Sequence, residues 1–80
     1  MNIRDKFYKT GEVAKLANLT IRTIRYYDQI DLLKPSKIDD NGYRLYTPSD
    51  LIKLQKITSL KQMGFSLENI KSMTISDSYL

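Results

Sequence analysis

Residues 20–28 concentrate side chains that can bind a polyanion on one predicted helix. At about 100° per residue, Ile21 and Ile24 share one face of that helix with the part of the helix surface next to Asp28. The opposite face is basic and aromatic: it presents Arg22, Thr23 and Tyr26, with Arg25 and Tyr27 on its flanks. Arginine donates two parallel hydrogen bonds to phosphates or guanine edges, and tyrosine adds a hydroxyl on a rigid arm. An ordinary solvated face can have the same composition, so the surrounding chain has to decide between the two interpretations.

The chain before this segment predicts a shorter helix and a tight turn. Residues 10–17 carry apolar side chains at i, i+3 and i+4, which is helical spacing. Asn18 tolerates the left-handed backbone that a sharp turn between helices often requires. Thr20 suits the N-cap of the next helix, because its hydroxyl can accept from an unpaired backbone N–H. Two helices joined by a tight turn form a helix-turn-helix.

A β-hairpin is predicted over residues 37–46. The Asn-Gly pair at 41–42 is a strong hairpin signal and predicts a type I′ turn with two positive φ angles. On the return strand Tyr43 and Arg44 point to opposite sides. Tyr46 is expected to pack on the helices, whereas Arg44, at the root of the hairpin, is expected to contact a phosphate.

Two further helices follow the hairpin. Thr47 and Asp50 have capping-box spacing at the start of a helix that is expected to run to Met63. Gly64 suits its end, and Ser66 suits the cap of a fourth helix. The sequence therefore predicts a mainly α fold, a winged helix-turn-helix with a small β-hairpin wing and two further helices.

Composition excludes several classes of function. The 80 residues contain no cysteine and no histidine, so disulfides, cysteine nucleophiles and thiolate or imidazole metal sites are excluded. No phosphate-cradling glycine loop and no convincing carboxylate pair is present, and Asp39 and Asp40 are better explained as turn formers. We expect no enzyme activity and no cofactor.

Hydropathy indicates a soluble chain, and the charge fits a polyanionic partner, although many proteins that bind none share it. The net charge of +4 fits a polyanion, but the basic residues are spread along the chain and do not locate the site. No apolar run approaches the roughly 18 residues of a membrane span, and the N-terminus has no signal segment. The expected location is the cytoplasm, without membrane association.

Four stretches of the chain carry motifs whose order and spacing are informative together. They are residues 8–14, 20–28, 41–46 and 60–70. Together they resemble the DNA-binding domain of the MerR family of bacterial transcription regulators. The pairing of Arg-Tyr-Tyr at 25–27 with Gly-Tyr-Arg at 42–44 is much more specific than a generic helix-turn-helix pattern.

The resemblance covers residues 8–73 and implies sequence-specific binding of double-stranded DNA in transcription regulation. In the family the second helix enters the major groove, the wing lies along the backbone or minor groove, and RNA polymerase engages the distorted promoter. A homodimer binding an inverted repeat is implied for the full-length form. The expected DNA-binding residues are Thr20, Arg22, Thr23, Arg25, Tyr26, Tyr27, Tyr43 and Arg44, together with Lys37, which lies near a wing position that is often arginine in the family.

The chain also departs from the family pattern. Asn18 and Asp31 stand where glycine is usual, and both tolerate left-handed geometry. We expect residues 1–7 to be a flexible N-terminal arm and 74–80 a C-terminal tail, without the dimerisation helix and effector domain of full members. The operator, the effector and the choice between activation and repression are not specified.

Two other functions fit these features. An excisionase-like architectural DNA-binding accessory factor could use the same winged fold. A protein-interaction module could use the helix at residues 51–63, if a missing dimerisation element leaves apolar surface exposed.

Overall fold

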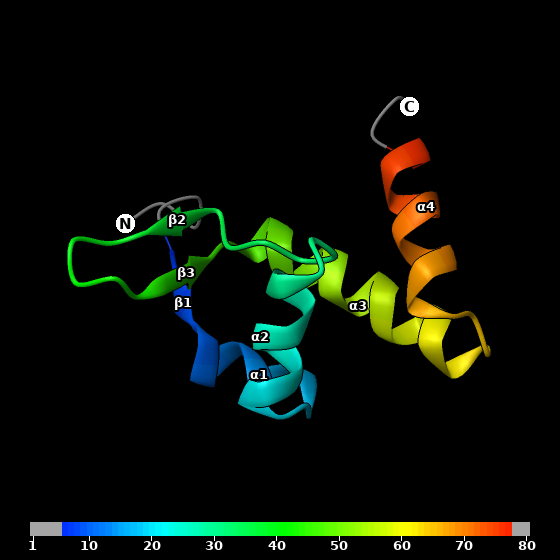
Figure 1. Cartoon of the computed structure of the whole chain (residues 1–80). Helices are drawn as coiled ribbons and strands as arrows, with labels where there is room; N and C mark the ends of the chain where they lie inside the picture. Colours follow the sequence, from blue (N-terminus) through cyan, green and yellow to red (C-terminus); the bar gives the residue numbers. More distant parts are fainter. Residues whose placement is uncertain (1–5, 78–80) are drawn as a thin grey trace.

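The computed structural model describes residues 6–77, and side chains as far as Met73. In chain order the elements are β1 (Tyr8–Lys9), α1 (Thr10–Ala17), α2 (Ile21–Gln29), β2 (Lys37–Ile38), β3 (Arg44–Tyr46), α3 (Pro48–Gln62) and α4 (Leu67–Asp77) (Figure 1). The mainly α winged fold with two further helices is confirmed. Of the expected terminal segments, residues 1–5 and 78–80 lie outside the described residues, and α4 continues four residues into the expected tail.

The helix-turn-helix forms as its local signals predict. Asn18 has φ 56° and ψ 42°, and the N–H of Leu19 donates to the carbonyl of Ala14 at 2.8 Å, which closes the turn. Thr20 caps α2, because its Oγ1 accepts from the backbone N–H of Thr23 at 3.0 Å. These contacts fix the direction in which α2 leaves α1.

The wing belongs to a three-stranded antiparallel sheet with strand order β1-β3-β2. The sequence did not predict β1, which pairs Tyr8 with Tyr46 and so places residues 8–9 against the wing root. β2 and β3 pair Ile38 with Arg44 on the other side of β3. The sheet therefore connects the wing to the N-terminus of α1 (Figure 1).

The predicted type I′ turn is wrong. Gly42 has a positive φ of 84°, but Asn41 does not, whereas a type I′ turn needs both. The N–H of Asp39 donates to the carbonyl of Tyr43 at 3.0 Å, so three residues form the loop. Asp39 Oδ1 accepts from the N–H groups of Asn41 and Tyr43, both at 2.9 Å, and these bonds stabilise the longer loop with its left-handed glycine.

The caps of α3 and α4 confirm the sequence prediction. Thr47 Oγ1 accepts from the N–H of Asp50, and Asp50 Oδ2 accepts from the N–H of Thr47. Gly64 ends α3 with φ 95°, and Ser66 Oγ accepts from the N–H of Asn69. In Figure 1, α4 projects from the far end of α3, away from the wing.

One apolar core connects the helix-turn-helix, the sheet and the last two helices. Its most buried side chains are Val13, Ile24, Leu33, Tyr46, Leu54, Ile57 and Ile70. The predicted packing of Tyr46 on the helices is confirmed, since its side chain is 0% exposed. Because Ile24 and Tyr46 share this core, α2 and the wing root are held in one arrangement. None of the helices described is long and apolar enough to cross a membrane.

Candidate nucleic-acid interface

The exposed face of α2 carries the basic and aromatic residues expected there. Arg22, Arg25 and Tyr26 are exposed, and with Thr23 and Gln29 they line a shallow hollow along the helix. The sequence did not single out Gln29, which continues this face by one turn from Arg25. The face contains several donors and no carboxylate, as a surface for phosphates or base edges requires.

Two residues of α2 do not lie where the helical periodicity predicted them. Ile21 was expected to face inward, but its side chain is 45% exposed, with its Cδ1 next to Gly11 of the neighbouring α1. Tyr27 was expected on the flank of the exposed face, but it is 6% exposed and lies in the core cluster. Burial raises the pKa of its hydroxyl. Tyr27 therefore supports α2 from within and is not part of the exposed face.

The two threonines of this segment interact with each other. Thr20 Oγ1 and Thr23 Oγ1 lie 2.9 Å apart, in addition to the cap bond from the Thr23 N–H. Thr20 is exposed at the N-terminus of α2 and Thr23 is half-buried. Their geometry shows that they define the start of α2.

The sheet contributes a second set of basic and aromatic side chains. Tyr43 is 52% exposed, and Lys9 Nζ lies 4.5 Å from the centre of its ring. Lys37 is exposed and its Nζ lies 5.6 Å from the ring centre of Phe7. Such cation–π contacts hold the lysine side chains against aromatic rings beside the sheet while leaving the charge accessible. Lys9 was missed because its proximity to Tyr43 depends on β1, which the sequence pattern did not reveal.

A hollow between α1, α2 and the wing brings the two sets together. It is lined by Lys9, Lys15, Arg25, Tyr43 and Arg44, with Thr10, Gly11, Glu12, Ile21, Asn41 and Gly42. Glu12 is its one acidic residue, and its Oε1 accepts from the N–H of Lys9 at 3.0 Å. Arg25 lines this hollow and also the hollow along α2, so the two form adjoining parts of one basic surface.

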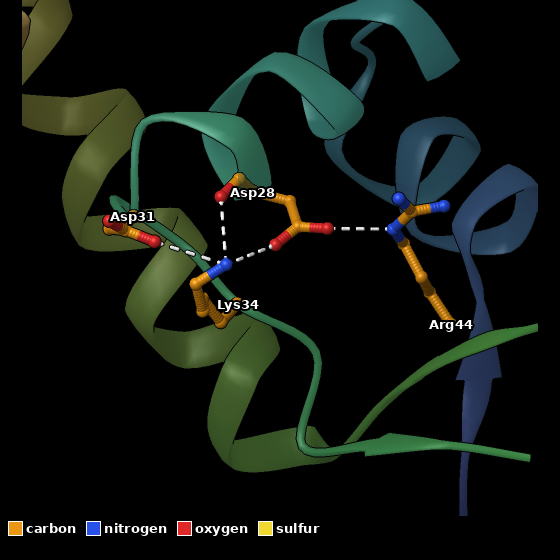
Figure 2. Close-up of polar contacts among 4 residues, drawn as sticks. All are labelled: Asp28, Asp31, Lys34 and Arg44. Carbon is orange, nitrogen blue, oxygen red and sulfur yellow. Dashed lines mark hydrogen bonds and ion pairs between the residues drawn. The ribbon is translucent and has the colours of Figure 1, made fainter.

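Arg44 lies at one edge of this surface in a network with Asp28, Asp31 and Lys34 (Figure 2). Its Nε donates to Asp28 Oδ2 at 2.7 Å, and Lys34 Nζ donates to Asp28 Oδ1 at 2.9 Å. Lys34 Nζ also lies 3.0 Å from Asp31 Oδ1. The hydrogen bond from Lys34, with that from Arg44, holds the pKa of Asp28 below its ordinary value despite burial.

Neither Lys34 nor the role of Asp28 could be read from local sequence, because the network joins α2, the following loop and β3. Acidic side chains elsewhere do not gather into a metal site: the described part of the chain holds no group of three or more such ligands.

Comparison with known proteins gives consistent matches. Residues 8–75 match the family described as "MerR HTH family regulatory protein". The chain is 51% identical over 70 residues to the Multidrug-efflux transporter 1 regulator of Bacillus subtilis (strain 168), covering 86% of this chain and 25% of that protein.

Two solved structures show the same fold. The N-terminus of MtaN, the Bacillus subtilis multidrug transporter activator, superposes with a TM-score of 0.82 at 46% identity, covering 84% of this chain and 63% of that one. The second is HiNmlR, a MerR family regulator lacking the sensor domain and bound to promoter DNA. It superposes with a TM-score of 0.79 at 34% identity, covering 85% of this chain and 54% of that one. The chain thus spans only part of the length of each relative.

Proposed function

The chain belongs to the MerR helix-turn-helix family of regulatory proteins, and on this premise we propose that it binds double-stranded promoter DNA in a sequence-dependent manner. In the proposed complex α2 enters the major groove and the wing follows the backbone. The observation that carries this proposal is the continuous basic surface in which Arg25 joins the exposed face of α2 to the wing hollow.

The roles of individual residues follow from their exposure. Arg22, Arg25 and Tyr26 are exposed on α2 and are assigned to base edges or nearby phosphates. Tyr43 in the wing loop and Lys37 and Arg44 on the sheet are assigned to phosphates. Thr20 and Thr23 set the start of the helix beside the DNA, and Tyr27 holds α2 from the core.

The wider setting is proposed from the family. HiNmlR, at 34% identity, is bound to promoter DNA in its solved structure, which supports the same class of ligand here. We assign the full-length protein a homodimeric state on an inverted repeat, with RNA polymerase as its partner at the promoter. The role is binding and not catalysis, and the location is the cytoplasm.

Selection of bound duplexes from a randomised DNA pool at near-physiological salt tests this function. An enriched inverted repeat would support sequence-specific binding as a dimer. A single enriched half-site would support sequence-specific binding by one DNA-binding domain. A variant carrying Arg22→Ala, Arg25→Ala and Tyr26→Ala serves as the control and is expected to enrich nothing. Absence of enrichment with the unaltered chain would contradict the proposal and favour shape-driven, excisionase-like binding.

A further inference from the structure

Asp28 is an acidic residue on the helix that is proposed to enter the DNA. It lies in the last turn of α2, where the helix dipole disfavours an anion, and its side chain is only 12% exposed. A nearly buried carboxylate at this position is unfavourable unless cations pair with it. Lys34 and Arg44 supply that pairing, one to each carboxylate oxygen (Figure 2).

The pairing leaves most of the Arg44 guanidinium available. Only its Nε is engaged with Asp28, and among the residues that the structure describes none accepts from its two terminal Nη groups. A guanidinium carries five donors in a rigid fork, so fixing one edge determines where the others point. The side chain is 39% exposed and lines the hollow shared with Arg25 and Tyr43.

Lys34 and Arg44 each take one oxygen of the Asp28 carboxylate. Arginine commonly grips a carboxylate through two parallel hydrogen bonds, which would use a second nitrogen. Here Oδ1 of Asp28 already accepts from Lys34 Nζ at 2.9 Å, and Arg44 takes Oδ2 alone. In this arrangement neither Nη group of Arg44 donates to Asp28.

We propose that Asp28 is a positioning residue for DNA binding: it holds Arg44 by Nε so that the Nη groups donate to a backbone phosphate at the wing root. The same contact ties β3 to the last turn of α2 and so fixes the wing relative to the helix. This inference rests on the proposed DNA binding. It assigns a favourable effect on affinity to an acidic residue, which is the opposite of what its charge alone would give.

Asp28→Asn and Asp31→Asn form a matched pair for the test. Each removes one negative charge from the same network, and Asp31, with φ 61°, is at a position where asparagine is accepted. Asp31 makes no contact with Arg44 that would position it. The measurement is the affinity for the most enriched duplex of the selection, and for a mixed-sequence duplex, over a series of salt concentrations.

Loss of a charge-assisted positioning bond is expected to lower the affinity of Asp28→Asn about tenfold. Its plot of log affinity against log salt is expected to become shallower by about one unit, although its net charge has risen. Asp31→Asn is expected to bind at least as tightly as the unaltered chain, with the same slope. In an Arg44→Gln background, Asp28→Asn is expected to cause no further loss.

Tighter DNA binding by both asparagine variants would overturn the positioning role. So would an equal loss of affinity on Asp28→Asn in the unaltered chain and in the Arg44→Gln background. If Asp28→Asn does not fold, Arg44→Lys gives a second test, because lysine keeps the charge but lacks the rigid fork in which one nitrogen is held by Asp28 while two others donate to a phosphate. Wild-type affinity and slope in Arg44→Lys would reject the proposal. Failure of the unaltered chain to bind any duplex would instead reject the proposed function.

Discussion

Arg22 and Tyr26 are exposed on α2, whereas their neighbour Tyr27 is buried. We expect Arg22→Ala and Tyr26→Ala each to weaken binding of the enriched duplex by about 1–3 kcal/mol, the value typical of a base contact. Neither change removes core packing, so the melting temperature is expected to stay close to that of the unaltered chain. Fluorescence anisotropy and thermal melting measure the two quantities.

The control for this pair is Lys53→Ala, an exposed position on α3 outside both basic hollows. It removes one positive charge, as Arg22→Ala does, and is expected to change affinity far less. Unchanged affinity in both α2 variants would remove the assignment of α2 as the recognition helix.

Asp28 makes stability depend on pH. Lys34 and Arg44 lower its pKa in the folded state, so its contribution to stability is present above the ordinary carboxyl pKa of about 4. That contribution is lost as the pH falls through the lower pKa of the folded state. Lys34 has a raised pKa, so its own contribution is lost only in strongly alkaline solution. Urea unfolding between pH 2 and 6 is therefore expected to show a shallower acid decline in Asp28→Asn, and parallel curves would contradict this account.

At the scale of elements, the two glycines at 11 and 42 give opposite predictions. A Cβ at Gly11, inside α1, would meet Ile21 Cδ1 of α2 at 3.8 Å, which is an ordinary contact, so Gly11→Ala is expected to raise the free energy of unfolding by about 0.5–1 kcal/mol. Gly42 has φ 84° and open space around it, so Gly42→Ala is expected to lower the free energy of unfolding by about 1–2 kcal/mol through backbone strain alone. Urea titration of both variants measures the two changes, and a Gly42→Ala variant as stable as the unaltered chain would contradict the three-residue loop with its left-handed glycine.

Helix boundaries were predictable because their signals are local. Thr20, Thr47 and Ser66 each accept from a backbone N–H three residues later, as the sequence spacing indicates. The type of hairpin turn was not predictable from Asn-Gly alone, because Asp39 accepts two backbone bonds and stabilises a longer loop. The short strand β1 was missed since it exists only through pairing with β3, far along the chain.

Within the candidate site, residue types were easier to predict than contacts. Periodicity placed Arg22 and Tyr26 outward correctly, but it placed Tyr27 on a flank, although Tyr27 is buried in a core that includes Leu32 and Tyr46. Partners such as Asp28 and Arg44 lie on elements separated by a loop and a strand, so no local pattern relates them. The expected DNA contacts themselves are not tested by the structure and stay predictions.

For the whole molecule, the basic surface divides into a helical part and a sheet part that meet at Arg25. The helical part presents the arginine and tyrosine side chains of α2, whereas the sheet part presents lysines held over aromatic rings, as Lys9 is over Tyr43. Phosphate contacts fix the register of a protein on DNA but carry no sequence information directly. Affinity and sequence preference are therefore expected to respond to different substitutions.

Lys9→Gln tests this division, because Lys9 belongs to the sheet and was not part of the set predicted from sequence. If it contacts a phosphate, the variant is expected to lose affinity by the same factor for the enriched and the mixed-sequence duplex, with a salt slope shallower by about one unit. Lys53→Gln on α3 is the matched control and is expected to keep the slope. A loss confined to the enriched duplex would mean that Lys9 takes part in sequence recognition, and the separation between helix and sheet would have to be abandoned.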